Sequence, residues 1–173
     1  MLNTSHTTLL PADFAGHSRV WIYQADRPFT PQEARQIETM VQAFTRDWKS
    51  HGTPVRADGY LFYGQFICLM ADETATGVSG CSTDSSVHLI KQIEQHTGAH
   101  LFDRLNLAFY IGTKVHLVPL AHLPKQLENG LIQADTLYFN NTIQTKEELE
   151  ASWLIPLKDS WLGKKYLRAQ AAS

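Results

Sequence analysis

The run YLFYGQFICLM, from Tyr60 to Met70, limits the possible folds more than any other stretch of this chain. Alternate residues of a strand point to opposite faces of the sheet, and here both sets are apolar apart from Gln65. A strand that is apolar on both faces belongs inside a sheet that is covered on both sides. The sequence therefore predicts a central strand with Gly64 as a candidate bulge, and the preceding Asp58-Gly59 predicts a hairpin turn.

The flanking segments predict the other elements from apolar periodicity, capping residues and breakers. Before the second loop these are a strand at 18–25, a helix from the capping box TPQE at 30–33 to His51 with Gly52 as its stop, and the hairpin. After that loop they are a helix over about 84–96 ended by Gly98, a hairpin around Gly112-Thr113, a short helix at 124–129, a strand at 135–141 and a helix opened by TKEE at 145–148.

The element order to Ile111 is β-α-β-β-α-β, which predicts a ferredoxin-like core of the α+β class followed by a β-α-β-α extension. A length of 173 residues suits one hydrophobic core, so we expect a single domain over 1–173. In a ferredoxin-like core both helices lie on one face of the sheet. The other face of the central strand then needs a cover, either from elements after Lys114 or from a second copy in a homodimer.

Charge and composition limit the partners. Fifteen Lys and Arg against 17 Asp and Glu give a net charge of −2, and the basic tail GKKYLR is too short for a nucleic-acid surface, so no nucleic-acid partner is expected. The longest apolar stretch, FICLMA, is far shorter than the roughly 20 residues that span a bilayer, and no basic, apolar leader is present. Cys68 and Cys81 show no disulfide pattern. We expect a soluble cytoplasmic protein with free thiols and no membrane partner.

The stretch SGCSTDSS, directly before the second predicted helix, is the candidate ligand site. It consists of Ser79, Gly80, Cys81, Ser82, Thr83, Asp84, Ser85 and Ser86. Hydroxyl and carboxylate oxygens cap helix starts, and one cap would suffice, so capping alone is one interpretation. The other is a cradle for an anion or polar molecule, with Cys81 as a reactive thiolate whose pKa the helix dipole lowers.

Other residues offer weaker candidates for chemistry. His51, Asp72 and Glu73 are candidate bases for Cys81, and Arg104 offers a guanidinium for a carboxylate or phosphate. His88 is two helical turns, about 10 Å, from Cys81, which is too far for a catalytic pair. The histidines and cysteines show no paired ligand spacing, so neither a metal nor a cofactor is predicted.

Five segments carry a family resemblance: SRVWIYQA, KSHG, SGCSTDSSVHLIKQIE, LFDRLNLA and FNNTIQTKEELEASWLIPLKDSW. Over most of its length the chain resembles a family of small uncharacterised bacterial proteins, of Bacteroidetes type, often labelled "ABC transporter ATPase". An ATPase of that class needs a GxxxxGK[ST] loop around the phosphates, and the chain contains none. We therefore predict that ABC-type ATPase activity is absent.

Two functions remain open at this point. The first is binding of a small anionic or polar molecule at Ser79 to Ser86, with catalysis by Cys81 left undecided. The second is a non-catalytic protein-interaction module that uses an apolar sheet face or the Trp-containing C-terminal region.

Overall fold

The computed structural model describes residues 6–72 and 80–171, and the side chains of 6–72 and 83–168. Helices and antiparallel sheets place the chain in the α+β class. Backbone contacts divide it into two compact units, the first formed by 1–103 with 143–150 and the second by 104–142 with 151–173.

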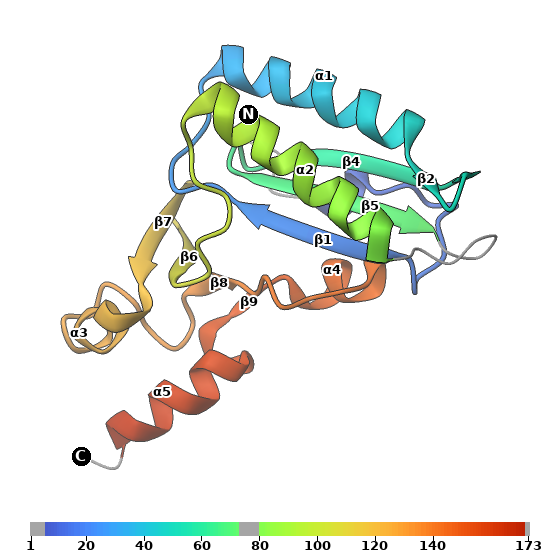
Figure 1. Cartoon of the computed structure of the whole chain (residues 1–173). Coiled ribbons are helices and arrows are strands. Elements are labelled where there is room, and N and C mark those ends of the chain that lie inside the picture. The colour runs from blue at the N-terminus through green and yellow to red at the C-terminus, as the bar shows by residue number, and fades with distance from the viewer. Residues whose placement is uncertain (1–5, 73–79, 172–173) are drawn as a thin grey trace. The chain divides into compact units, whose positions relative to one another are not determined.

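The first unit is built on a three-stranded antiparallel sheet with the order β1-β5-β4 (Figure 1). The strands are β1 (Arg19–Gln24), β4 (Arg56–Phe62) and β5 (Phe66–Asp72). All seven residues of β5 are buried. The prediction of a central strand covered on both sides is therefore confirmed for β5.

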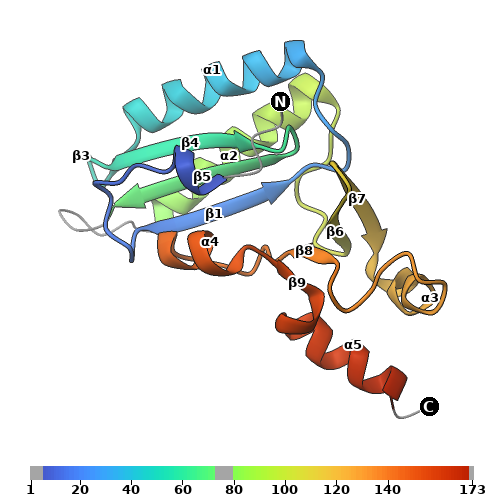
Figure 2. The same cartoon turned by 180° about the vertical axis from the view of Figure 1, so that it is seen from behind.

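Helices α1 (Pro31–Asp47) and α2 (Gly80–Thr97) lie side by side on one face of this sheet (Figures 1 and 2). The predicted capping box opens α1, because the Thr30 hydroxyl accepts from the Glu33 amide and the Glu33 carboxylate accepts from the Thr30 amide. Apolar residues of both helices and of the strands form the core beneath them. They include Tyr23, Ile37, Val41, Ile67, Leu69, Leu89, Ile90 and Ile93.

Two segments distant in sequence meet in the same unit. The His6 ring lies 6.0 Å from the Phe62 ring, and its Nε2 is 3.0 Å from the Leu149 carbonyl oxygen. The buried Lys146 ammonium donates to the Phe14 carbonyl oxygen at 3.0 Å. N-terminal residues and residues 143–150 therefore pack together in this unit, and the latter follow Lys114, where the sequence suggested a cover.

The strand order does not confirm the ferredoxin-like topology. In that topology the strand predicted around 106–111 would pair with β1. Instead, the Val20 amide of β1 donates to the Gln144 carbonyl oxygen at 2.9 Å, and Arg19 forms an isolated bridge with Thr145. The predicted strand is present as β6 (Asn106–Ile111), but it pairs within the second unit's sheet.

The predicted hairpin turn at Asp58-Gly59 is wrong. Strand β4 runs through both residues, and the chain turns at Tyr63 and Gly64, which have φ values of 53° and 63°. The predicted strand from Tyr60 to Met70 is therefore two paired strands, β4 and β5, and Gly64 lies in the turn between them, not in a bulge. Long-range packing explains the difference, since a Cβ atom at Gly59 would collide with the Val41 side chain of α1. Gly59 thus allows α1 to lie close to the sheet.

The predicted extension of the first helix to His51 is also wrong. Helix α1 ends at Asp47, and the chain continues into a small hairpin of β2 (Lys49–Ser50) and β3 (Thr53–Pro54). His51 and Gly52 form its turn with φ values of 50° and 79°. Positive φ at both central residues is the requirement of a type I′ two-residue hairpin, so the Gly52 stop signal belongs to that turn.

The second unit contains an antiparallel sheet with the order β7-β6-β8-β9. Its predicted hairpin at Gly112 is confirmed. Thr145, which belongs to the first unit, caps α4 (Lys146–Ser152) by accepting from the Glu148 amide, but the Glu148 carboxylate accepts from the Gln144 amide, so only half of the predicted TKEE capping box forms. A final helix over the basic tail was not predicted from the sequence.

The remaining elements of the described chain, from both units, are η1 (His6–Leu9), β7 (Lys114–Pro119), η2 (Leu120–His122), α3 (Leu123–Glu128), β8 (Leu137–Phe139), α4 (Lys146–Ser152), β9 (Leu154–Pro156), η3 (Leu157–Asp159) and α5 (Trp161–Ala171).

Candidate functional site

An arginine ties the start of α1 to the end of α2. Arg27 donates to both carboxylate oxygens of Glu33, at 2.8 and 2.9 Å, and to the Thr97 carbonyl oxygen at 2.5 Å. The hydrogen bond from Arg27 is the largest cause that lowers the pKa of Glu33 to about 2, and the Thr30 backbone amide adds to it. The Glu33 carboxylate therefore stays ionised, and Arg27 links the start of α1 to the end of α2.

The outer surface between the two helices is hollowed. We call this hollow the interhelical groove; its volume is about 610 Å³, and it is lined by Met40, Ala43, Phe44, Asp47, Trp48, Lys49, Ser85, Leu89 and Gln92. An adjoining hollow of about 420 Å³ shares four of these residues and adds Asp84 and His88. The volume of the groove lies within the roughly 300–1,000 Å³ typical of small-molecule sites.

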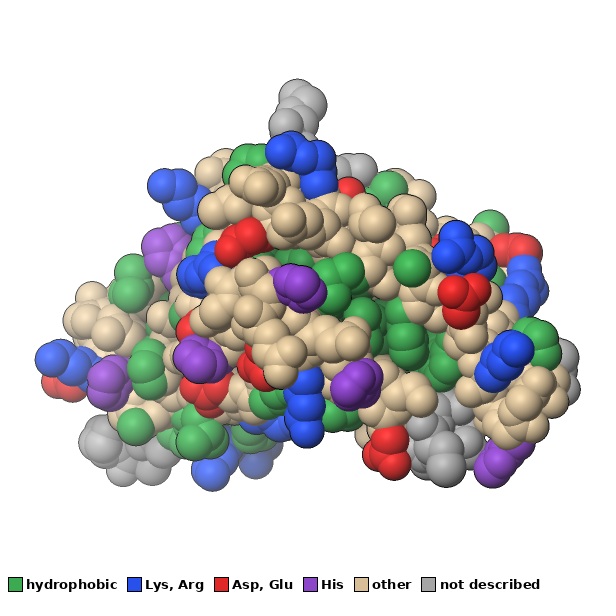
Figure 3. All heavy atoms as spheres, turned by 45° about the horizontal axis from the view of Figure 1, so that its top comes forward, with side chains coloured by type: hydrophobic (Ala, Val, Ile, Leu, Met, Phe, Trp, Pro, Cys, Tyr) green, Lys and Arg blue, Asp and Glu red, His purple; other side chains and the backbone are tan. Residues whose placement is uncertain are grey.

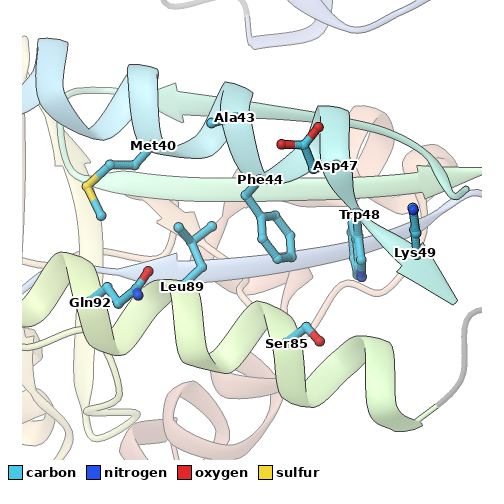
Figure 4. Close-up of a pocket in the computed structure, with 9 residues that line it drawn as sticks. All are labelled: Met40, Ala43, Phe44, Asp47, Trp48, Lys49, Ser85, Leu89 and Gln92. Carbon is cyan, nitrogen blue, oxygen red and sulfur yellow. The ribbon is translucent and has the colours of Figure 1, made fainter. Parts of the chain in front are cut away.

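Apolar side chains form the floor of the groove and polar side chains its rim. Figure 4 shows Met40 and Phe44 pointing from α1 toward α2, while Leu89 points back from α2. Hydrophobic side chains gather on this face of the molecule, with charged side chains around them (Figure 3). The lining contains one carboxylate, Asp47, and one ammonium, Lys49, so its formal charges cancel.

Trp48 connects the groove to the core. Its side chain is only 3% exposed, and its ring lies 4.9 Å from the Phe44 ring and 5.5 Å from the Trp21 ring, measured between centroids. Its indole Nε1–H is buried and has no hydrogen-bond partner among the described residues. Figure 4 shows this nitrogen at the end of the ring that faces α2. A buried donor without an acceptor costs about 1–3 kcal/mol, and buried Trp N–H groups usually have a partner.

The second predicted helix begins earlier than its sequence suggested. Helix α2 starts at Gly80 rather than about Asp84, so the run Thr83 to Ser86 lies inside the helix. Amides in a helix donate to the carbonyl four residues before, and the amides of Asp84 and later residues are therefore used within α2. The proposed cradle of free amides at Asp84 to Ser86 is not formed.

The side chains of this run point in different directions. Ser86 is fully buried and donates to the Thr83 carbonyl oxygen at 2.6 Å, which removes it from a ligand site. Asp84 and Ser85 are exposed. Ser85 lines the interhelical groove, and Asp84 lines the adjoining hollow beside His88. Part of the predicted polar stretch thus borders the groove.

Several predicted site residues lie outside the described part of the chain. Ser79 and Glu73 are not described, and for Gly80, Cys81 and Ser82 only the helical backbone is described. The reactive thiolate at Cys81 therefore stays a prediction. The other cysteine, Cys68, lies fully buried in β5, where burial raises the pKa of its thiol.

The remaining candidates are not among the residues that line the groove. His51 is exposed in the β2–β3 turn instead of at a helix end, so the helix dipole does not act on it. Asp72 is buried at the end of β5, and its carboxylate accepts from Arg56 at 3.4 Å. This ion pair accounts for the carboxylate at this position without a catalytic role. Arg104 is exposed and belongs to the second unit.

Met40, Phe44 and Trp48 follow one another at intervals of four residues, the spacing of an apolar stripe on the predicted first helix, but this spacing does not identify a site. An apolar stripe alone predicts burial, whereas a groove depends on how two helices are spaced. The one available signal was the indole of Trp48, a polar group at the end of an apolar stripe.

Within residues 6–72 and 80–171, no three His, Cys, Asp or Glu residues gather in a way that could hold a metal ion. No helix in that part of the chain has the length and apolar character to cross a membrane. No protein-family model, curated protein or solved structure matches the chain, so its function has to be inferred from its own residues.

Proposed function

We propose that this protein binds a small organic molecule in the interhelical groove between α1 and α2. The observation that carries the proposal is the composition of the groove, an apolar floor of Met40, Phe44 and Leu89 beneath a rim of polar side chains. Sites for small molecules combine apolar walls with a few polar groups that fix the orientation of the ligand. The groove meets both requirements, and Ser85 adds a residue of the polar stretch to its rim.

The proposed site differs in location and polarity from the site predicted from the sequence. That hypothesis placed an anionic or polar ligand on Ser79 to Ser86, whereas the groove offers a mainly apolar surface with Ser85 at its border. A protein-interaction module using the apolar face of the central strand has less support, because every residue of β5 is buried.

Methionine methyl groups provide a direct test. The chain has three methionines, of which Met40 lines the groove and Met70 is fully buried in β5. Toluene, a small apolar probe, is titrated within its limited aqueous solubility into protein labelled with ¹³C at the methionine methyl groups. The proposal predicts that the Met40 signal moves progressively while the Met70 signal stays in place.

Two variants make the test specific. Ser85→Phe places an aromatic ring at the border of the groove and should abolish the Met40 shift. Gln95→Phe puts the same ring at an exposed position of α2 that does not line the groove, and should leave the shift unchanged. A Met40 signal that toluene does not move, or that moves equally in the Ser85→Phe variant, would contradict groove binding.

A further inference from the structure

The indole N–H of Trp48 specifies the chemistry of the ligand more closely than the apolar floor does. Trp48 is only 3% exposed, and its Nε1–H has no hydrogen-bond partner among the described residues. Buried donors usually have an acceptor. The nitrogen has almost no exposed surface, so side chains of the groove that Trp48 lines must shift for an acceptor to reach it. Its ring is held between Phe44 and Trp21, so the direction of the N–H is fixed.

The charges of the lining distinguish between kinds of acceptor. Asp47 and Lys49 flank Trp48 in sequence and all three line the groove, so the lining contains one carboxylate and one ammonium. A carboxylate ligand would gain from Lys49 but would meet the negative charge of Asp47, whose carboxylate lies 3.4 Å from Nε of the exposed Arg46. An uncharged carbonyl oxygen supplies the acceptor without that repulsion and costs less to remove from water.

We infer that the ligand is an uncharged amphipathic molecule whose carbonyl oxygen accepts a hydrogen bond from Trp48 Nε1–H while its aryl or branched alkyl group lies on Met40, Phe44 and Leu89. The inference rests on the proposed function and adds the polar half of the ligand to it. Trp48 is the residue that selects for the acceptor, and the apolar floor selects for the other end.

Phenylacetamide and toluene are the two probes that separate these parts. Both carry an aromatic ring, but only phenylacetamide carries a carbonyl oxygen. The readout is the indole N–H signal of Trp48 in ¹⁵N-labelled protein, assigned by its loss in the Trp48→Phe variant. Phenylacetamide should move this signal downfield, and toluene should move the Met40 methyl signal without that downfield change.

The Trp48→Phe variant keeps an aromatic ring beside Phe44 and removes the donor. We expect it to bind phenylacetamide about three- to tenfold more weakly than the unmodified protein, because one net hydrogen bond is lost, and to bind toluene with affinity unchanged within about twofold. Trp161→Phe, at a 46% exposed position of α5, is the matched control and should change neither affinity. The methyl signal of Met70 confirms that each variant is folded.

The outcomes distinguish hydrogen bonding to the Trp48 N–H from the binding of small molecules in the groove. If both probes move Met40 but phenylacetamide leaves the Trp48 N–H signal in place, groove binding stands and the acceptor inference is overturned. Equal weakening of both probes by Trp48→Phe would also overturn it, since that result indicates a change of shape alone. Tighter binding of phenylacetate than of phenylacetamide would overturn the choice of an uncharged acceptor. If neither probe moves Met40, both proposals fail.

Discussion

Substitution of Gly59 by Ala tests how closely α1 packs on the sheet. Gly59 does not have positive φ, unlike five other glycines in the described part of the chain. In such a conformation, Gly to Ala usually stabilises a protein by about 0.4–1 kcal/mol through the unfolded state. Packing predicts the opposite sign here, because the new Cβ would overlap with Val41 and lie 3.3 Å from Leu69 Cδ2 and 3.4 Å from Thr45 Cγ2.

The expected magnitude follows from these two opposing effects. Overpacking a core costs about 1–3 kcal/mol, so Gly59→Ala should lower the free energy of unfolding of the first unit by about 1–2 kcal/mol. Val41 is 2% exposed, and Val41→Ala alone should cost about 2 kcal/mol by losing buried methyl groups. The double variant should be more stable than the sum of both losses by about 1 kcal/mol or more, because Val41→Ala removes the colliding atom.

Urea unfolding followed at the Met70 methyl signal is the assay, since Met70 lies in β5 of the same unit. Comparing the midpoints and slopes of the four proteins gives the coupling free energy between positions 59 and 41. A stabilised or neutral Gly59→Ala protein would refute the close approach of α1. Strict additivity in the double variant would show that Val41 is not the obstacle.

Two further predictions concern ionisable groups. Pairing lowers the pKa of Glu33 to about 2, so the stabilisation that the pair gives is present above the ordinary carboxyl pKa of about 4.5 and is lost as pH falls toward 2. Arg27→Ala should raise the pKa of Glu33 toward 4.5, as measured by NMR titration of its carboxyl group. An unchanged pKa would exclude Arg27 as the cause of the shift. Cys68 should resist thiol labelling in the folded protein, because it is buried and its pKa is raised. A Cys68→Ala variant should therefore be labelled as fully as the unmodified protein, and a loss of labelling would contradict the burial of Cys68. The pH profile of labelling in this variant shows whether the pKa of Cys81 lies below the free-thiol value of about 8.5.

Local patterns in the sequence were sufficient where local chemistry decides the structure. The TPQE box opens α1 as predicted, and the apolar run ending at Met70 contains a buried central strand. Turn placement failed at Asp58-Gly59, since an X-Gly pair is also present at Tyr63-Gly64. The choice between the two was made by contacts distant in sequence, the approach of Val41 at the first and a hydrogen bond from the Phe29 amide to the Gly64 carbonyl oxygen at the second.

The candidate site shows the same division. Composition identified a polar run, and Ser85 from that run does border the groove. Sequence could not show that Ser86 faces the interior, because five consecutive polar residues on a helix necessarily point in all directions. The unpaired indole of Trp48 was equally hidden, because an unmet hydrogen bond is a property of the packed chain.

The pairing of residues 144–146 with the edge of β1 has a consequence for synthesis on the ribosome. About forty residues of the second unit, from 104 to 142, leave the exit tunnel before the segment that completes the first unit. During that interval the backbone groups of Ser18 and Val20 have yet to meet Lys146 and Gln144, and the nascent chain carries an open strand edge. A nascent chain stalled between these points would therefore leave this edge of β1 open to pairing with another copy.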